Sequence, residues 1–124
     1  MGRQICGPDS FHSGFGLKFR ELELAGVWLI EQEPKGDERG FFSRSFCEKE
    51  FEAHGLLNRF PQHSYSFNRV RGTLRGMHWQ KEPGMETNVV TCVRGAVLDL
   101  VVDLRKDSKT YCKWAGVELS SENR

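Results

Sequence analysis

Long apolar runs, paired cysteines and an excess of one charge are all missing from this sequence, and each absence excludes a class of protein. No stretch approaches the roughly 18 apolar residues of a membrane span, and the N-terminus has no apolar stretch of the signal-peptide kind. Eighteen basic and 17 acidic side chains leave a formal charge of +1. Nucleic acids and anionic membranes both select a basic surplus, so neither is expected as the main partner.

Cysteine is scarce and scattered. The sequence has four cysteines and no C-x-x-C pair, which argues against a disulfide framework or a cysteine-rich zinc site. They are Cys6, Cys47, Cys92 and Cys112. We therefore expect reduced, mostly buried thiols and a cytoplasmic protein.

The length of 124 residues suits a single domain with one core. Thirteen glycines, nine phenylalanines and three tryptophans indicate tight turns between aromatic-rich strands. Residues 1–16 follow neither the helix nor the strand period, so we interpret them as a loose N-terminal extension. The domain itself is expected over residues 17–124.

Alternating and apolar stretches predict a mostly β protein. Strands are expected around Leu17–Arg20, Val27–Ile30, Gly40–Phe42, Val89–Val93, Ala96–Leu104 and Lys113–Leu119. A turn is expected at Pro34–Asp37. No helix separates the later strands, so antiparallel pairing is favoured. The Ala96–Leu104 strand has one apolar face and one face that includes Asp99 and Asp103, which suits a barrel or sandwich with a polar interior.

One short helix is expected over residues 46–54. Ser45 followed by Glu48 fits a capping box, and Gly55 supplies a C-terminal stop.

The densest chemistry lies in the stretch Leu74–Gln80, where Arg75 stands three residues before His78. Histidine is the usual side chain for moving protons near neutral pH. The same stretch also fits a strand-edge histidine bonded to a backbone carbonyl. In a straight strand Arg75 and His78 point to opposite faces, so a bulge or bend near Gly76 is needed if both reach one pocket.

Two further patterns have competing interpretations. Arg39, in the charged stretch before Phe41 and Phe42, fits a solvated turn or an arginine that grips a phosphate. His78 begins a His-x-Gln pattern with Glu82 and Glu86 downstream, but glutamine is a poor ligand for transition metals, so a metal site is not favoured.

Six stretches, in order, resemble the dTDP-4-dehydrorhamnose 3,5-epimerase family of nucleotide-sugar epimerases. They are Gly36–Phe42, Phe60–Ser64, Thr73–Gln80, Val93–Asp99, Val102–Arg105 and Lys113–Asn123. The resemblance implies a cupin-like antiparallel β-barrel or jelly roll without metal or redox cofactor, assembled as a homodimer. It also implies a nucleoside-diphosphate 4-keto-6-deoxy sugar as substrate, in dTDP-rhamnose and polysaccharide biosynthesis.

By position, the resemblance implies a role for each of several residues. His78 matches the general base, Arg39 and Arg75 match substrate-binding arginines, and Gln62 matches a residue at the nucleotide end. Asn88 occupies the substrate-binding position where the family usually has a lysine near the ketone oxygen. Other differences are Arg44, in place of a glutamate, and His63-Ser64 after Gln62, in place of Asp-Asn.

The sequence ends at Arg124, before the family's second histidine-bearing segment, its tyrosine proton donor and the acidic partner of the base. We therefore expect a C-terminally truncated family member that holds the N-terminal two thirds of the domain and has an incomplete barrel. Such a chain is expected to bind substrate weakly and to turn over little. Two alternatives remain open: a non-catalytic sugar-nucleotide binding module, and a metal-dependent cupin enzyme.

Overall fold

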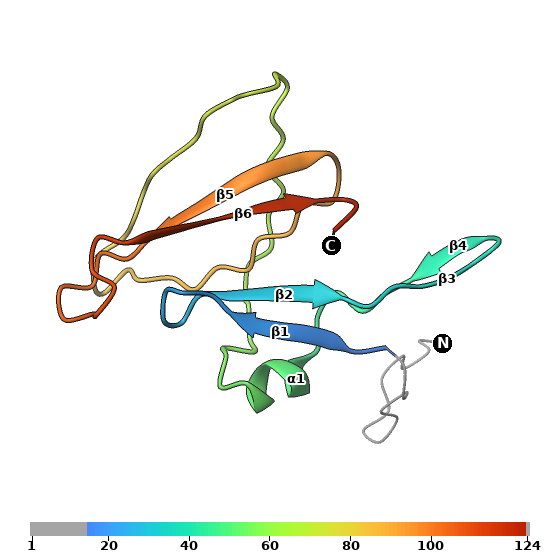
Figure 1. Ribbon diagram of the computed structural model, residues 1–124, viewed down its shortest axis with the longest axis horizontal. Coiled ribbons are helices and arrows are strands. Elements are labelled where there is room, and N and C mark those ends of the chain that lie inside the picture. Colours follow the sequence, from blue (N-terminus) through green and yellow to red (C-terminus); the bar gives the residue numbers. More distant parts are fainter. Residues whose placement is uncertain (1–14, 124) are drawn as a thin grey trace.

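The computed structural model describes residues 15–123, which form three separate antiparallel strand pairs and one short helix (Figure 1). The elements are β1 (Leu17–Glu21), β2 (Trp28–Gln32), β3 (Lys35–Asp37), β4 (Gly40–Phe42), α1 (Glu48–Ala53), β5 (Ala96–Val102) and β6 (Trp114–Ser120). The expected mostly β fold with one short helix is confirmed. The expected loose extension, residues 1–16, lies outside the described residues except for its last two positions.

The β1–β2 hairpin forms where the alternating pattern predicts it. Phe19 pairs with Ile30 in its antiparallel register. The connecting turn is closed by two backbone hydrogen bonds, from Leu22 N to Val27 O at 2.8 Å and from Val27 N to Leu24 O at 3.0 Å. Gly26 takes a φ of +82°, a left-handed conformation that side chains with a Cβ rarely adopt.

The predicted turn at Pro34–Asp37 is wrong by a few residues. Residues 35–37 form β3, which pairs with β4 so that Lys35 lies opposite Phe42. The turn follows at residues 38–39, where the Asp37 carboxylate accepts a hydrogen bond from the Arg39 backbone N–H at 2.9 Å. An aspartate that bonds the backbone two residues on starts a turn by itself, so the turn begins at Asp37.

Helix α1 lies within the predicted range, but its N-terminal cap is not the predicted one. The helix begins after Cys47, whose extended backbone makes it the N-cap without a side-chain hydrogen bond. The Ser45–Glu48 capping box is therefore wrong. The predicted stop at Gly55 is confirmed, since this residue has a φ of +68° and its N–H donates to Glu52 O.

The β5–β6 hairpin confirms the two C-terminal strands and their antiparallel pairing, with Val97 opposite Leu119. Ala115, Val117 and Leu119 on one face of this hairpin are half-buried, whereas most residues of the other face are exposed, and no other sheet of the described residues pairs with it. The expected polar barrel interior is therefore not enclosed within residues 15–123.

The buried apolar core of the described residues is small and lies around the β1–β2 hairpin. Leu24 is 1% exposed and Phe51 of α1 is 2% exposed. Phe51 contacts the rings of Phe19, Phe46 and Phe60, with ring centroids 5.4, 4.7 and 6.1 Å away. This aromatic cluster holds α1 against the hairpin.

Residues 57–94 contain neither helix nor strand, so the predicted strand at Val89–Val93 is wrong for the described structure. In Figure 1 this segment runs from α1 past the β5–β6 hairpin, turns, and returns to the start of β5. Every residue from 61 to 91 is exposed. Within this segment, only the backbone N–H groups of Thr73 and Gly84 donate hydrogen bonds to backbone carbonyls of the described residues. A strand needs a partner strand to pair with, and none of the described strands pairs with this segment.

Candidate functional site

Arg39 lies at the tip of the β3–β4 hairpin, where an ion pair fixes its direction. Its Nε and Nη2 donate to Asp37 Oδ2 at 3.1 and 2.5 Å. The hydrogen bonds from Arg39 lower the pKa of the Asp37 carboxyl, and the same pairing raises the pKa of Arg39. Because the Arg39 side chain is 84% exposed, the pair is screened by water and leaves the guanidinium accessible to an anion.

Arg75 and His78 lie on either side of Gly76, which has a φ of +93°, a left-handed conformation. The sequence calls for a bulge or bend here only if both side chains reach one pocket, and the described residues 73–80 contain no bend or turn. A Cβ placed on Gly76 would lie 3.8 Å from His78 Cε1, so the imidazole lies close to this glycine. Arg75 Nη1 donates to the Ser66 hydroxyl, which ties two distant parts of the 57–94 segment together. Within the described residues no hydrogen bond joins Arg75 to His78.

The structure does not gather the predicted site residues into one enclosed site. Gln62, Arg75, His78 and Asn88 all lie exposed in the 57–94 segment, whereas Arg39 lies on a separate hairpin. Within residues 15–123 His78 is exposed and faces no enclosed interior. The assigned roles of the five residues stay predictions.

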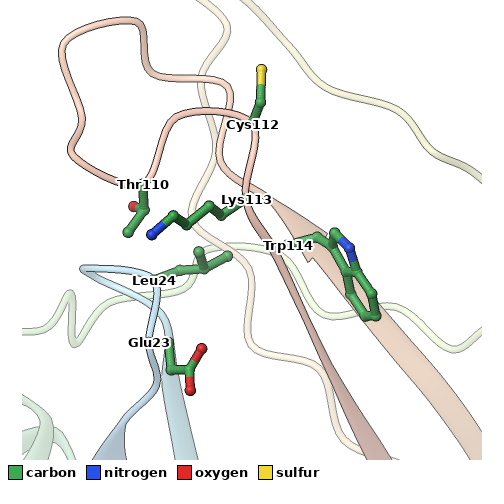
Figure 2. A pocket seen from close by; sticks show the side chains of 6 residues that line it. All are labelled: Glu23, Leu24, Thr110, Cys112, Lys113 and Trp114. Atoms are coloured by element: carbon green, nitrogen blue, oxygen red, sulfur yellow. The ribbon is translucent and has the colours of Figure 1, made fainter.

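Two hollows lie elsewhere in the described residues, between the first hairpin with its turn and the β6 end of the β5–β6 hairpin. One hollow of about 370 Å³ is lined by Glu23, Leu24, Thr110, Cys112, Lys113 and Trp114 (Figure 2). A second, of about 580 Å³, runs between residues 20–23 and residues 114–118. Figure 2 shows the Lys113 amine beside Thr110, the Glu23 carboxylate on the other side of Leu24, and the Cys112 thiol pointing away from the other side chains. Both hollows are open, and neither contains a predicted site residue.

The cysteines differ from expectation in burial but not in pairing. Cys47, Cys92 and Cys112 are free, as predicted, but two are half-buried and Cys112 is exposed. Cys6 lies outside the described residues.

Among residues 15–123 no three His, Cys, Asp or Glu side chains are grouped so that they could hold a metal ion. The helix found in this part of the chain is too short to span a membrane.

Sequence reasoning missed one polar network, around Asp103. Its side chain is 1% exposed, yet it accepts hydrogen bonds from Arg105, Ser108 and Thr110. Arg105 also donates to the carbonyl of Ala25, 80 residues away in the β1–β2 turn. The Asp-x-Arg spacing was visible in the sequence, but nothing local indicated the distant carbonyl.

Comparison with known proteins gives consistent matches. The family model for dTDP-4-dehydrorhamnose 3,5-epimerase matches residues 21–124. A curated protein from Methanothermobacter thermautotrophicus, named dTDP-4-dehydrorhamnose 3,5-epimerase, is 46% identical over 108 residues, which are 87% of this chain and 57% of the relative.

Two solved structures resemble the chain in three dimensions. The Bacillus anthracis dTDP-4-dehydrorhamnose 3,5-epimerase with TDP and PPi bound matches with a TM-score of 0.83 at 39% identity, over 87% of this chain and 62% of that one. A 3,5-epimerase from Legionella pneumophila in complex with dTDP-4-keto-L-rhamnose matches with a TM-score of 0.75 at 34% identity, over 88% and 57%. The chain therefore spans little more than half the length of these proteins.

Proposed function

This chain belongs to the dTDP-4-dehydrorhamnose 3,5-epimerase family, and from that premise we propose that it serves as an isomerase of nucleoside-diphosphate 4-keto-6-deoxy sugars. The observation that carries the proposal is the likeness to the Bacillus anthracis epimerase solved with TDP and PPi. The Legionella pneumophila complex with dTDP-4-keto-L-rhamnose supports a keto sugar as the substrate. The reaction would serve rhamnose formation, and through it polysaccharide synthesis, in the cytoplasm.

Epimerisation beside a ketone requires few catalytic groups. A C–H beside a ketone is acidic because the carbanion delocalises onto the carbonyl oxygen as an enolate. Epimerisation at C3 or C5 then needs a base on one face and a proton donor on the other. Each pKa unit of mismatch between base and carbon acid costs about 1.36 kcal/mol, so hydrogen bonds to the developing enolate oxygen must supply several kcal/mol. No redox step is involved.

We assign the base to His78 and the holding of substrate to Arg39, Gln62, Arg75 and Asn88. The left-handed backbone of Gly76 supports this assignment, since it breaks the strict alternation that would point Arg75 and His78 to opposite faces of a straight strand. The exposed guanidiniums of Arg39 and Arg75 suit the diphosphate, which arginine binds in a bidentate manner. Asn88 can donate a hydrogen bond to the ketone oxygen, but without the charge of a lysine.

The extent of the accessible surface supports a further part of the proposal, that this chain works in an assembly. The chain has 11,424 Å² of accessible surface. A folded monomer of 14.3 kDa is expected to have about 6,800 Å². We propose that a second copy covers part of this surface as a homodimer and helps to enclose the 57–94 segment. Analytical ultracentrifugation is expected to show a dimer, and a monomer at every accessible concentration would contradict this part.

Deuterium wash-in tests the catalytic proposal. The chain is incubated in D2O with dTDP-4-keto-6-deoxyglucose, and deuterium at C3 and C5 is followed by NMR. We expect slow exchange that depends on His78, so that H78N abolishes it while the exposed control R71K leaves it unchanged. Equal exchange in H78N and the parent chain would exclude His78 as the base.

A non-catalytic binding module is the second candidate. It is favoured by the exposure of His78 outside both hollows and by Asn88 at the position where the family usually has lysine. Calorimetric titration with dTDP separates the two candidates. Binding that R75A weakens, together with no deuterium at either carbon, would favour the binding module.

A further inference from the structure

The β1–β2 and β5–β6 hairpins belong to different sheets and share no backbone ladder. Among residues 15–123, one side-chain hydrogen bond joins these two hairpins. It runs from Arg105 Nη2, in the loop between β5 and β6, to the carbonyl of Ala25 at 2.8 Å. The relative position of the two hairpins therefore depends on how firmly Arg105 is held.

Arg105 is held by Asp103. The guanidinium Nε donates to Asp103 Oδ1 at 2.8 Å and Nη2 donates to Oδ2 at 2.8 Å, a two-pronged arrangement that fixes the plane of the side chain. The Arg105 backbone N–H donates to the same carboxylate at 3.0 Å. Since the Arg105 side chain is 56% exposed, it would be mobile without this carboxylate.

Asp103 in turn is held by its own loop. The hydroxyls of Ser108 and Thr110 each donate to Oδ2 at 2.6 Å. The Asp103 backbone pairs with the far side of the loop, donating to Lys113 O at 2.9 Å and accepting from Cys112 N at 2.7 Å. A carboxylate that is almost fully buried and accepts this many hydrogen bonds is fixed in one position.

A buried apolar side chain lies beside this connection. Leu24, next to Ala25, is 1% exposed, and it lines the smaller hollow together with Thr110 and Trp114 from the β5–β6 hairpin. Figure 2 shows Leu24 at the β1–β2 turn pointing toward Lys113. The hydrogen bond from Arg105 and the buried Leu24 therefore lie at the same turn.

We propose that Asp103, Arg105 and the Ala25 carbonyl form a latch that joins the β1–β2 hairpin to the β5–β6 hairpin. Asp103 is the positioning residue, and Arg105 makes the connection. The latch sets the width of the larger hollow, whose two walls belong to the two hairpins. This role is independent of the proposed epimerase activity, because the latch contains none of the residues assigned to catalysis or substrate binding.

Amide hydrogen exchange by NMR on the full chain tests the latch. In R105K, which keeps the charge but loses the two-pronged geometry, the turn amides of Leu22 and Val27 are expected to exchange about tenfold faster. The ladder amides of β5–β6 should keep their protection. R71K serves as the matched control, since Arg71 is exposed and outside the latch.

Two results would overturn the proposal. Unchanged exchange at Leu22 and Val27 in R105K would show that Arg105 does not hold the turn. Equal acceleration in both hairpins would show that Arg105 stabilises the whole fold instead of joining two parts. D103N should loosen both the turn and the loop of residues 103–113, and if this variant fails to fold, R105K still decides.

Discussion

The β1–β2 hairpin with α1 and the 57–94 segment differ in how they are supported. The first region contains both fully buried apolar side chains of the described residues, Leu24 and Phe51. The second has no secondary structure and only two backbone N–H groups with backbone partners. Four of the five residues assigned to the site lie in this second region. Packing and the proposed chemistry therefore lie in different parts of the chain, and the proposed second copy would cover the second of them.

Two alanine substitutions, one in each region, should show the difference between the regions in the free energy of unfolding. Phe51→Ala removes the ring at the centre of the aromatic cluster, and we expect it to cost about 3–5 kcal/mol in urea unfolding. Leu74→Ala, in the 57–94 segment, removes a side chain that is 91% exposed and should change stability by less than about 0.5 kcal/mol. A similar loss in both variants would remove the distinction between the regions.

Replacing Glu50 is expected to cause the next largest loss of stability. Its carboxylate accepts a hydrogen bond from Leu17 N at 2.8 Å and pairs with Arg44 at 2.6 Å, with the Glu50 side chain only 14% exposed. Glu50→Ala leaves both donors without a partner, so a loss of about 1–3 kcal/mol is expected. Glu52→Ala, on the same helix but exposed, is the control. Equal urea midpoints for the two variants would contradict the anchoring role of Glu50.

Acid should loosen the latch. The hydrogen bonds from Arg105, followed by those from Ser108 and Thr110, hold the pKa of the Asp103 carboxyl well below its usual range. A carboxyl with a lowered pKa stabilises the fold above its unfolded pKa of about 3.9, and this stabilisation is lost as the pH falls. The urea midpoint of the parent chain should therefore decline below about pH 5, and that of Asp103→Asn should decline less. Parallel curves for the two proteins would contradict this assignment.

Alanine substitutions at two glycines are expected to change stability the least. Gly55 and Gly76 both have positive φ, but Gly55 ends α1 whereas Gly76 lies in the 57–94 segment. Gly55→Ala should cost about 1 kcal/mol, since a Cβ is strained in this conformation. Gly76→Ala should leave the urea midpoint unchanged, because the unsupported segment can relax locally. It should nevertheless reduce deuterium wash-in by displacing His78.

Local sequence patterns were sufficient for most elements. Alternation located β1, β5 and β6, a short apolar run located β2, and Gly55 marked the end of the helix. Strand β3 was hidden because Lys35-Gly36-Asp37 has turn composition and becomes a strand only through pairing with β4. Conversely, Val89–Val93 has strand composition but no neighbour to pair with among the described residues. Pairing is a long-range property that composition does not record.

The site could be predicted only in part for the same reason. The motifs marked Arg75 and His78, but not how the two side chains lie relative to each other. Whether these side chains face a cavity depends on surfaces far away in the sequence. The bond from Arg105 to Ala25 spans 80 positions and is likewise not recorded in either local stretch.

Hydrogen exchange measured peptide by peptide on the intact chain tests the division between the two regions most directly. Peptides from the β1–β2 hairpin and α1 should be protected, whereas those from residues 57–94 should exchange almost as fast as an unfolded chain at concentrations too low for association. Raising the concentration should slow exchange in the 57–94 segment as the proposed second copy covers it. Strong protection of this segment in the isolated monomer would contradict the account.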